Sequence, residues 1–362
     1  SRGLGDVYKR QIIEYGLGYP VEYYTTEKAV DGIVATTGCT VGKGSLHLTH
    51  CGMKEGRLWF MFVKDGGDYA GKCVYITVDK NELKTWLEQE ALATNKETVR
   101  RDFMALPANN NTVFPKTMTP EGPPVEDLNY EYLISDAGKA RWGNLYGGYA
   151  RLDASGDEFS VITISNIWAM DNPKAGDVFA VSQMHDHICP GMTAGKFLAA
   201  YMYKNLPLGQ DEEYHIVSCP QYCKDDYFAW MVHTTPGTKT LTSTTLSSAD
   251  QQKLNAVGAG NVAGVFIRWN TNTKTGNALV LLFDFGAVAT DAGVSTNDFK
   301  DYSTYKWWVS RLKCAVAMMQ YLDTPERYVS AYGSTYNIDE TTFKKLKEAG
   351  NNPYVVLGII TP

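Results

Sequence analysis

The stretch whose residue types could do chemistry is His185-Asp-His187-Ile-Cys189-Pro-Gly191, which Gly195 follows four residues later. Two imidazoles and one thiol stand on alternate residues, and in an extended segment such side chains point to the same side. Imidazole and thiolate both suit Zn²⁺ and neighbouring transition metals. The structural alternative is that Cys189 is a small buried apolar residue. Three such donors within five positions favour a ligand set, so we expect His185, His187 and Cys189 to meet one metal ion.

Pro190 predicts that a helix begins directly after this stretch. Proline suits the first helical turn, where its missing N–H would have no partner. Residues 192–206 place apolar side chains at helical spacing. Cys189 would then lie at the positive end of a helix, a setting that lowers a thiol pKa and makes thiolate available.

A second group of polar residues, Cys223 and Asp226, follows an expected strand that contains His215, for which a structural role is expected. Cys223 could supply a fourth ligand, and Asp226 could ligate or orient a histidine. Three protein ligands would leave a position for water or substrate, whereas four would make the site structural. The sequence leaves both open. A weaker alternative is redox chemistry between Cys189 and Cys219 or Cys223, since Cys-x-x-x-Cys differs from the usual Cys-x-x-Cys motif.

Composition excludes several classes of function. The chain of 362 residues has a formal net charge of −6 and no basic block, so nothing indicates binding to nucleic acid or to an anionic membrane surface. No apolar run is long enough to span a bilayer. Seven scattered cysteines do not form the disulfide framework of a small secreted domain. The length favours two domains.

The order of the chain predicts where those domains lie. Residues 1–11 resemble a translated adapter sequence of the kind found in some metagenomic assemblies, so we exclude them and expect the natural chain to begin upstream. Residues 107–128 are rich in Pro and Asn and are expected to be a linker. The two halves are then 12–106 and 129–362.

Regular elements are expected in both halves, from period and turn signals. The expected strands are 58–63, 74–78, 158–168, 215–217, 262–269 and 279–285, and the expected helices are 80–106 (one or a pair), 192–206, 305–322 and 341–349. Residues 34–45 are expected to form a glycine-punctuated turn.

The two halves share a spaced pattern that indicates a tandem duplication. Asp31 lies eight residues before Cys39, and Asp226 lies eight residues before Thr234; both members of the second pair lie 195 positions after their counterparts. In each half this spacing precedes a Gly/Thr-rich turn and then two expected strands.

With these residues in hand, the second half resembles the FmdE family of formylmethanofuran dehydrogenase subunits. The family pattern His-x-His-x-Cys-Pro-Gly, with a glycine four residues on, is matched by His185, His187, Cys189, Pro190, Gly191 and Gly195. A second signature, Cys-x-x-Asp followed by Gly-Cys-Thr-x-Gly-Lys-Gly, is divided between the halves. Its front is matched by Cys223 and Asp226, and its later part by Asp31, Gly38, Cys39, Thr40, Gly42, Lys43 and Gly44. Lys28 and Thr234 stand where the two remaining cysteines are expected. The likeness covers roughly 12–78 and 131–285.

The resemblance implies an α+β fold of two degenerate repeats, the second with a C-terminal helical extension. Because family members resemble domains that pair as dimers, the tandem chain is expected to be a built-in pseudo-dimer. Asp31, Cys39 and Lys43 of the first half would then complete, or lie close to, the site of the second half. Simple decay of a redundant half is the alternative. By the same offset, a second histidine motif is expected upstream of residue 1.

The function that the resemblance implies is that of a metal-binding accessory protein in C1 or methanogenic metabolism of an archaeal kind. Its cofactor would be zinc or another divalent transition metal, and its partners other C1-pathway proteins or a small-molecule ligand. The namesake enzyme reduces carbon dioxide onto methanofuran at a molybdenum or tungsten pterin centre on other subunits, so this chain need not catalyse that reaction. The alternative is a metal-dependent enzyme on a small C1-type or pterin-like substrate. Family resemblance implies the cytoplasm, while the composition also suits export.

Overall fold

The chain forms two compact units in the computed structural model. The first comprises Ser1–Asp171, Ser182–His187 and Asp301–Val309, and the second comprises Asn172–Val181, Ile188–Lys300 and Ser310–Pro362. The structure describes residues 10–14, 28–42, 45–49, 58–63, 73–107, 110, 112–113, 117–118, 163–164, 166–168, 170, 172–185, 187–298 and 306–362.

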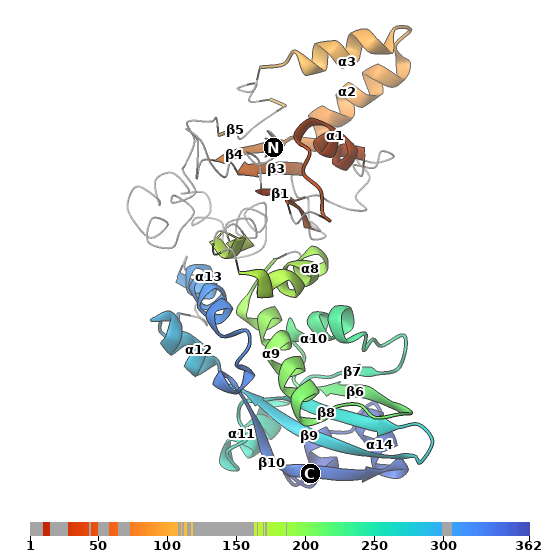
Figure 1. Ribbon diagram of the computed structural model, residues 1–362, viewed down its shortest axis with the longest axis vertical. Helices are drawn as coiled ribbons and strands as arrows, with labels where there is room; N and C mark the ends of the chain where they lie inside the picture. Colours follow the sequence, from red (N-terminus) through yellow and green to blue (C-terminus); the bar gives the residue numbers. More distant parts are fainter. Residues whose placement is uncertain are drawn as a thin grey trace, which may run out of the picture. The chain divides into compact units, whose positions relative to one another are not determined.

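The first unit contains a five-stranded mixed sheet with the order β2-β1-β3-β4-β5 (Figure 1). Its strands are β1 (Arg10–Glu14), β2 (Leu46–Thr49), β3 (Leu58–Val63), β4 (Cys73–Val78) and β5 (Thr117–Met118). β1 and β2 run parallel and the other neighbours run antiparallel. Helix α1 (Lys28–Thr37) contributes Ile33 to a small buried cluster with Cys39 and Leu46. The strands predicted at 58–63 and 74–78 are confirmed as β3 and β4.

Two further helices of the first unit, α2 (Lys80–Leu92) and α3 (Lys96–Met104), form a hairpin. The side chain of Asp79 accepts hydrogen bonds from two backbone N–H groups of α2, and Asn95 accepts one from Thr98 of α3, so both helices begin at a capping residue. Trp86 and Phe103 pack edge to face, with ring centroids 5.4 Å apart. The predicted helix pair is confirmed.

The second unit contains another five-stranded sheet, with the order β10-β9-β8-β6-β7 (Figure 1). Its strands are β6 (Glu212–Ser218), β7 (Leu241–Ser243), β8 (Val262–Asn270), β9 (Thr275–Phe283) and β10 (Val329–Asp339). β6 and β7 run parallel, and the remaining neighbours are antiparallel. Taken in chain order, the five strands of each sheet have the same neighbours and the same relative directions.

Helices cover both faces of the second sheet. On one face lies α9 (Pro190–Asn205), whose Phe197 packs edge to face on Phe283 and Tyr328. The other face packs on α11 (Ser248–Ala256), α14 (Glu340–Lys347) and α15 (Pro353–Val356). The core on that side is apolar and is built from alternate residues of the strands, including Val265, Ile267, Trp269, Ala278, Val280 and Ile338. This arrangement confirms the α+β fold class.

Two further helices are α12 (Phe285–Ala292), which belongs to the second unit, and α13 (Lys306–Met318), which belongs to it from Ser310 onward. Cys314 lies buried in α13. Among the helices that the structure describes, none is both long and apolar enough to cross a membrane.

Three predictions of local structure were wrong. Residues 34–37 close α1 and do not belong to a turn. In the expected strand 158–168, residues 163–164 and 166–168 are helical, because a short run rich in Val and Ile cannot be told from a buried helix by period alone. Phe285 begins α12, capped by the side chain of Asp284, and does not end a strand. The predicted pseudo-dimer and the boundaries at residues 11, 106 and 128 stay predictions.

Candidate metal centre

The histidine–cysteine motif lies at the junction of two helices. Helix α8 (Gly176–His185) ends on His185, and α9 begins on Pro190. Cys189 is the N-cap of α9, with φ −135° and ψ 163°, and its Sγ accepts a hydrogen bond of 3.3 Å from the N–H of Met192. The helix start at Pro190 is confirmed. The fully extended conformation expected for 185–189 is wrong at its first residue, because His185 is still helical.

Two glycines of α9 bring a second thiol close to Cys189. A Cβ on Gly195 would lie 2.4 Å from the Cβ of Tyr227, and one on Gly191 would lie 3.2 Å from the Cβ of Cys223. The helix α10 (Lys224–Tyr227), which follows Cys223, can therefore approach the α9 backbone only because both side chains are absent. The same hypothetical Cβ of Gly191 would lie 3.4 Å from the Sγ of Cys223 and 3.6 Å from that of Cys189. The glycines of the motif thus position its thiols.

Three donor atoms meet at this junction. One ligand atom each of His185, Cys189 and Cys223 lies within 4.8 Å of the other two. Zinc bonds to sulfur and nitrogen are about 2.0–2.3 Å long, which places tetrahedral ligands roughly 3.5 Å apart. The cluster is therefore close to the geometry that one ion requires. Cys189 is fully buried, and the other two residues are partly buried.

The surroundings of Cys189 favour the thiolate. Its pKa is lowered, first by a hydrogen bond from the side chain of Cys223, and further by the charge of Arg311 and by the backbone N–H groups of Met192 and Gly191. Burial acts in the opposite direction. The N–H groups at the start of α9 thus contribute in the direction that the sequence predicted, while the hydrogen bond from Cys223 contributes most.

A buried lysine anchors the turn that carries Cys223. Lys224 is fully buried, and its Nζ donates hydrogen bonds to the hydroxyl of Ser218, the carbonyl of Pro220 and the carboxylate of Asp225. Burial lowers the lysine pKa, and the carboxylate of Asp225 opposes that shift. Sequence reasoning missed this network, because nothing in the residue pattern distinguishes a buried lysine from an exposed one. We assign Lys224 a positioning role.

The other predicted residues of the second half lie nearby. The imidazole of His187 packs beside that of His185, with ring centroids 4.5 Å apart, but His187 is not among the three clustered donors. Asp226 lies in the first turn of α10, and its N–H donates to the carbonyl of Cys223. Metal ligation by His187, and by Asp226 directly or through a histidine, stays a prediction.

The predicted residues of the first half are placed within their own unit. Asp31 is exposed in the first turn of α1, and Cys39 is buried against Ile33 and Leu46. Lys43 lies outside the described residues. The contribution of these residues to the metal centre of the second half stays a prediction.

An α+β domain that presents imidazole and thiol donors at a helix junction belongs to the class of candidate metal-binding domains. Residues 184–327 match the family model described as FmdE, Molybdenum formylmethanofuran dehydrogenase operon. The match includes all three clustered donors and supports membership of the FmdE family, in agreement with the motif. No curated protein matches the chain. The tandem repeat and the N-terminal truncation stay predictions.

Proposed function

We propose that this chain is a metal-binding accessory protein related to FmdE of formylmethanofuran dehydrogenase, with a role in C1 metabolism alongside other proteins of that pathway. The observation that carries the proposal is the convergence of His185, Cys189 and Cys223 on one point. The family match supports the relation to FmdE.

The donor set suits zinc or another divalent transition metal. Thiolate and imidazole are ligands of these ions, whereas calcium and magnesium prefer oxygen. Two thiolates also neutralise the charge of a divalent cation, so the complex with Cys189, Cys223 and a neutral imidazole has no net charge to bury. The partly to fully buried positions of the three residues are therefore compatible with a bound ion.

A second candidate function is a metal-dependent enzyme acting on a small C1-type or pterin-like substrate. Three protein donors leave a fourth tetrahedral position, which in catalytic zinc sites holds water or substrate. The imidazole of His187 packs beside that of His185 and is therefore a candidate to fill that position. Coordination by His187 would close the shell and favour the accessory role.

Metal content is the test of the proposal. Elemental mass spectrometry on chain purified without chelator is expected to find about one divalent ion per chain, and Cys189→Ser and Cys223→Ser are expected to lose it. Cys219→Ser is the matched control, since Cys219 is another buried thiol of the same unit that lies outside the cluster. Equal metal content in the control and in both site variants, all folded by circular dichroism, would contradict the proposal.

Cobalt substitution distinguishes the two functions. A tetrahedral Co²⁺ site with two thiolates has strong visible and sulfur-to-metal absorption. If His187→Ala replaces a protein ligand with exchangeable water, the native shell is closed and the accessory role is supported. If the wild-type ion already holds exchangeable water, the enzyme is supported. Chain that binds no metal but forms a Cys189–Cys223 disulfide would favour the thiol redox alternative.

A further inference from the structure

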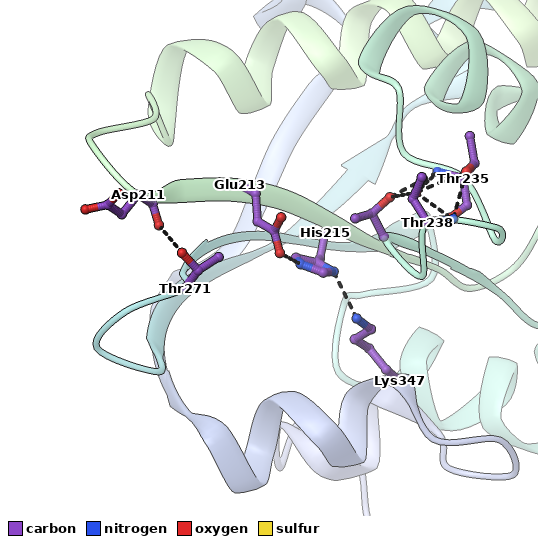
Figure 2. Close-up of polar contacts among 8 residues, drawn as sticks. Asp211, Glu213, His215, Thr235, Thr238, Thr271 and Lys347 are labelled. Carbon is purple, nitrogen blue, oxygen red and sulfur yellow. Dashed lines mark hydrogen bonds and ion pairs between the residues drawn. The ribbon is translucent and has the colours of Figure 1, made fainter.

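Three ionisable side chains of the second unit form a hydrogen-bonded line that shares no residue with the His185–Cys189–Cys223 cluster. Glu213 and His215 lie on the same face of β6, two residues apart, and Lys347 reaches that face from the last turn of α14 (Figure 2). The Nε2 of His215 lies 2.7 Å from Oε1 of Glu213, and its Nδ1 lies 3.0 Å from Nζ of Lys347. Residues 132 positions apart in the chain thus form one continuous hydrogen-bonded line.

The direction of each hydrogen bond follows from the chemistry of the groups. An ammonium has no lone pair, so Nδ1 of His215 must be the acceptor from Lys347. The ring proton is then on Nε2 and is donated to the carboxylate of Glu213. His215 is buried, and burial lowers its pKa against the opposing effect of Glu213, so the imidazole is held neutral. A neutral imidazole with an unprotonated nitrogen facing an amine is a general base in position.

The two charged groups that act on Lys347 come from β6 and from the turn before β7. Burial is the largest effect and lowers the pKa of its ammonium; Lys239, in the turn before β7, lowers it further, and Glu213 of β6 opposes both. The net effect lowers the pKa of the Lys347 ammonium, so the neutral amine is more populated than in an ordinary exposed lysine.

An aromatic surface completes the surroundings of the amine. The Nζ of Lys347 lies 4.6 Å from the ring centroid of Phe343, one turn earlier on α14. Phe343 stacks on Trp269 with centroids 3.9 Å apart, and it meets the imidazole of His215 edge on. Because these rings pack on one another, Lys347 and His215 are held in fixed relation, and the side chain of Lys347 remains partly exposed.

We propose that Lys347 is a nucleophilic lysine that takes an acyl group from an activated acyl donor, a thioester or an acyl phosphate. A nucleophile within hydrogen-bond reach of a base, itself oriented by a third group, is the arrangement that activates nucleophiles in unrelated proteins. Lys347 is the nucleophile, His215 the base and Glu213 the residue that positions the imidazole. This site is separate from the His185–Cys189–Cys223 cluster and does not depend on the proposed metal.

The transfer balances without a further reactant. The ammonium of Lys347 first loses one proton to solvent, which frees the Nζ lone pair. That lone pair attacks the carbonyl carbon of the donor, a C–N bond forms, and the C–S or C–O bond breaks. The leaving thiolate or phosphate departs with the electron pair. His215 Nδ1 takes the proton that Nζ loses, and Glu213 stabilises the imidazolium until that proton passes to solvent or to the leaving group. The product is a neutral amide on Lys347, which has lost its positive charge.

A matched comparison exists on the same helix. Lys344 lies one turn before Lys347 on α14, with a side chain 72% exposed and an ion pair of 2.9 Å to Glu340. Lys344 is accessible to reagents and lies on the same helix as Lys347. If exposure alone governed acylation, Lys344 would react faster than the half-buried Lys347.

The experiment is competitive acetylation of the folded full chain by acetyl phosphate at pH 7.5, followed by peptide mass spectrometry. Acetyl-coenzyme A in a second arm separates thioester from acyl phosphate donors. We expect Lys347 to be acetylated at least about threefold faster than Lys344 by one of the donors, and the ratio to fall to about one in denatured chain, where both amines have the ordinary lysine pKa.

Two variants test the role of the line of residues. Glu213→Gln changes a half-exposed residue, so the fold is expected to persist, and His215→Gln keeps a hydrogen-bond acceptor but removes the base. Each is expected to lower the rate at Lys347 about threefold or more and to leave Lys344 unchanged, which also reports that α14 is intact. A wild-type rate at Lys347 no faster than at Lys344 with either donor would overturn the proposal. The hydrogen bonds among Glu213, His215 and Lys347 would then have a structural role only.

Discussion

The two units build the same strand plan with different residues at one position. In both sheets the first strand pairs parallel with the second and antiparallel with the third, and the fourth and fifth follow antiparallel. Leu46 begins β2 and Leu241 begins β7, and these residues are 195 positions apart. At the same offset, Cys223 of the second unit corresponds to Lys28, the first residue of α1. The shared plan therefore does not require the thiol, which is expected if Cys223 serves chemistry rather than folding.

At a second pair of positions with the same offset, the cysteine is in the first unit and the second unit has another residue. Cys39 and Thr234, again 195 positions apart, are both buried; Cys39 follows α1, and Thr234 follows α10. Cys39 packs in an apolar cluster, while the hydroxyl of Thr234 donates to the carbonyl of Phe228 at 3.2 Å. Each residue thus suits its own surroundings. The tandem duplication and the predicted joining of Cys39 to the metal centre both stay predictions.

The largest expected difference between the units is in their response to acid, through one buried histidine in each. His47 in β2 is buried against Ser182 and Trp168, and burial lowers its pKa from 6.5 to about 4. The pKa of His215 is also lowered, but Glu213 opposes the shift. A histidine with a lowered folded pKa contributes stability above 6.5 that is lost as the pH falls toward 4, because the unfolded chain takes up the proton first.

We therefore expect the first unit to lose up to about 3 kcal/mol between pH 7.5 and pH 4.5 through His47 alone. Urea unfolding at both pH values, for wild type and His47→Gln, measures this contribution. Wild type is expected to lose more stability than the variant on acidification. Equal losses would mean that His47 is not held neutral by burial.

An intermediate effect is expected from two helical glycines, one in each unit. Gly195→Ala would place a Cβ against Tyr227 and the carbonyl of Lys224, and should cost about 1–3 kcal/mol and separate Cys223 from Cys189. Gly32→Ala in α1 meets nothing within 4 Å and should stabilise by about 0.5–1 kcal/mol. Thermal unfolding with metal analysis checks both, and a neutral Gly195→Ala that retains metal would refute the close approach of α10 to α9.

The smallest expected effect sharpens the comparison of the two cysteine positions. Cys39→Ala removes one sulfur from a small apolar cluster and should cost about 1 kcal/mol. The metal content should not change, because Cys39 packs in this apolar cluster and is not one of the three clustered donors. Elemental analysis of this variant beside Cys189→Ala decides the matter. If metal is lost from both, the two repeats share one site, as the divided signature suggested.

The sequence predicted most where a local rule applies. Pro190 predicted a helix start from its preference for the first helical turn, and the structure confirms it. The caps at Asp79 and Asn95 obey a similar local rule, although the prediction did not use it. The alternation of the strands likewise predicted β8 and β9 to within a few residues. The candidate ligands were predicted as a set, although the conformation that joins them was not.

What the sequence could not predict depends on contacts between distant residues. Lys224 looks like a surface lysine until the turn from Ser218 to Asp225 closes around it. The line from Lys347 to His215 likewise exists only because α14 packs on β6. In both cases tertiary structure decides whether a polar residue is solvated or buried, and no pattern of period or spacing carries that information.

The dependence of the thiol pair on two glycines has a consequence for how the chain would acquire the proposed ion. Cys189 and Cys223 are 34 positions apart, and β6 lies between them in the chain. They meet only when β6 has joined its sheet and α10 has come to rest against Gly191 and Gly195. A nascent or partly unfolded chain offers scattered donors, each too weak to retain a metal by itself. If the cluster binds an ion as proposed, we expect loading to follow the close approach of α10 to α9, so that metal binding would report a folded domain.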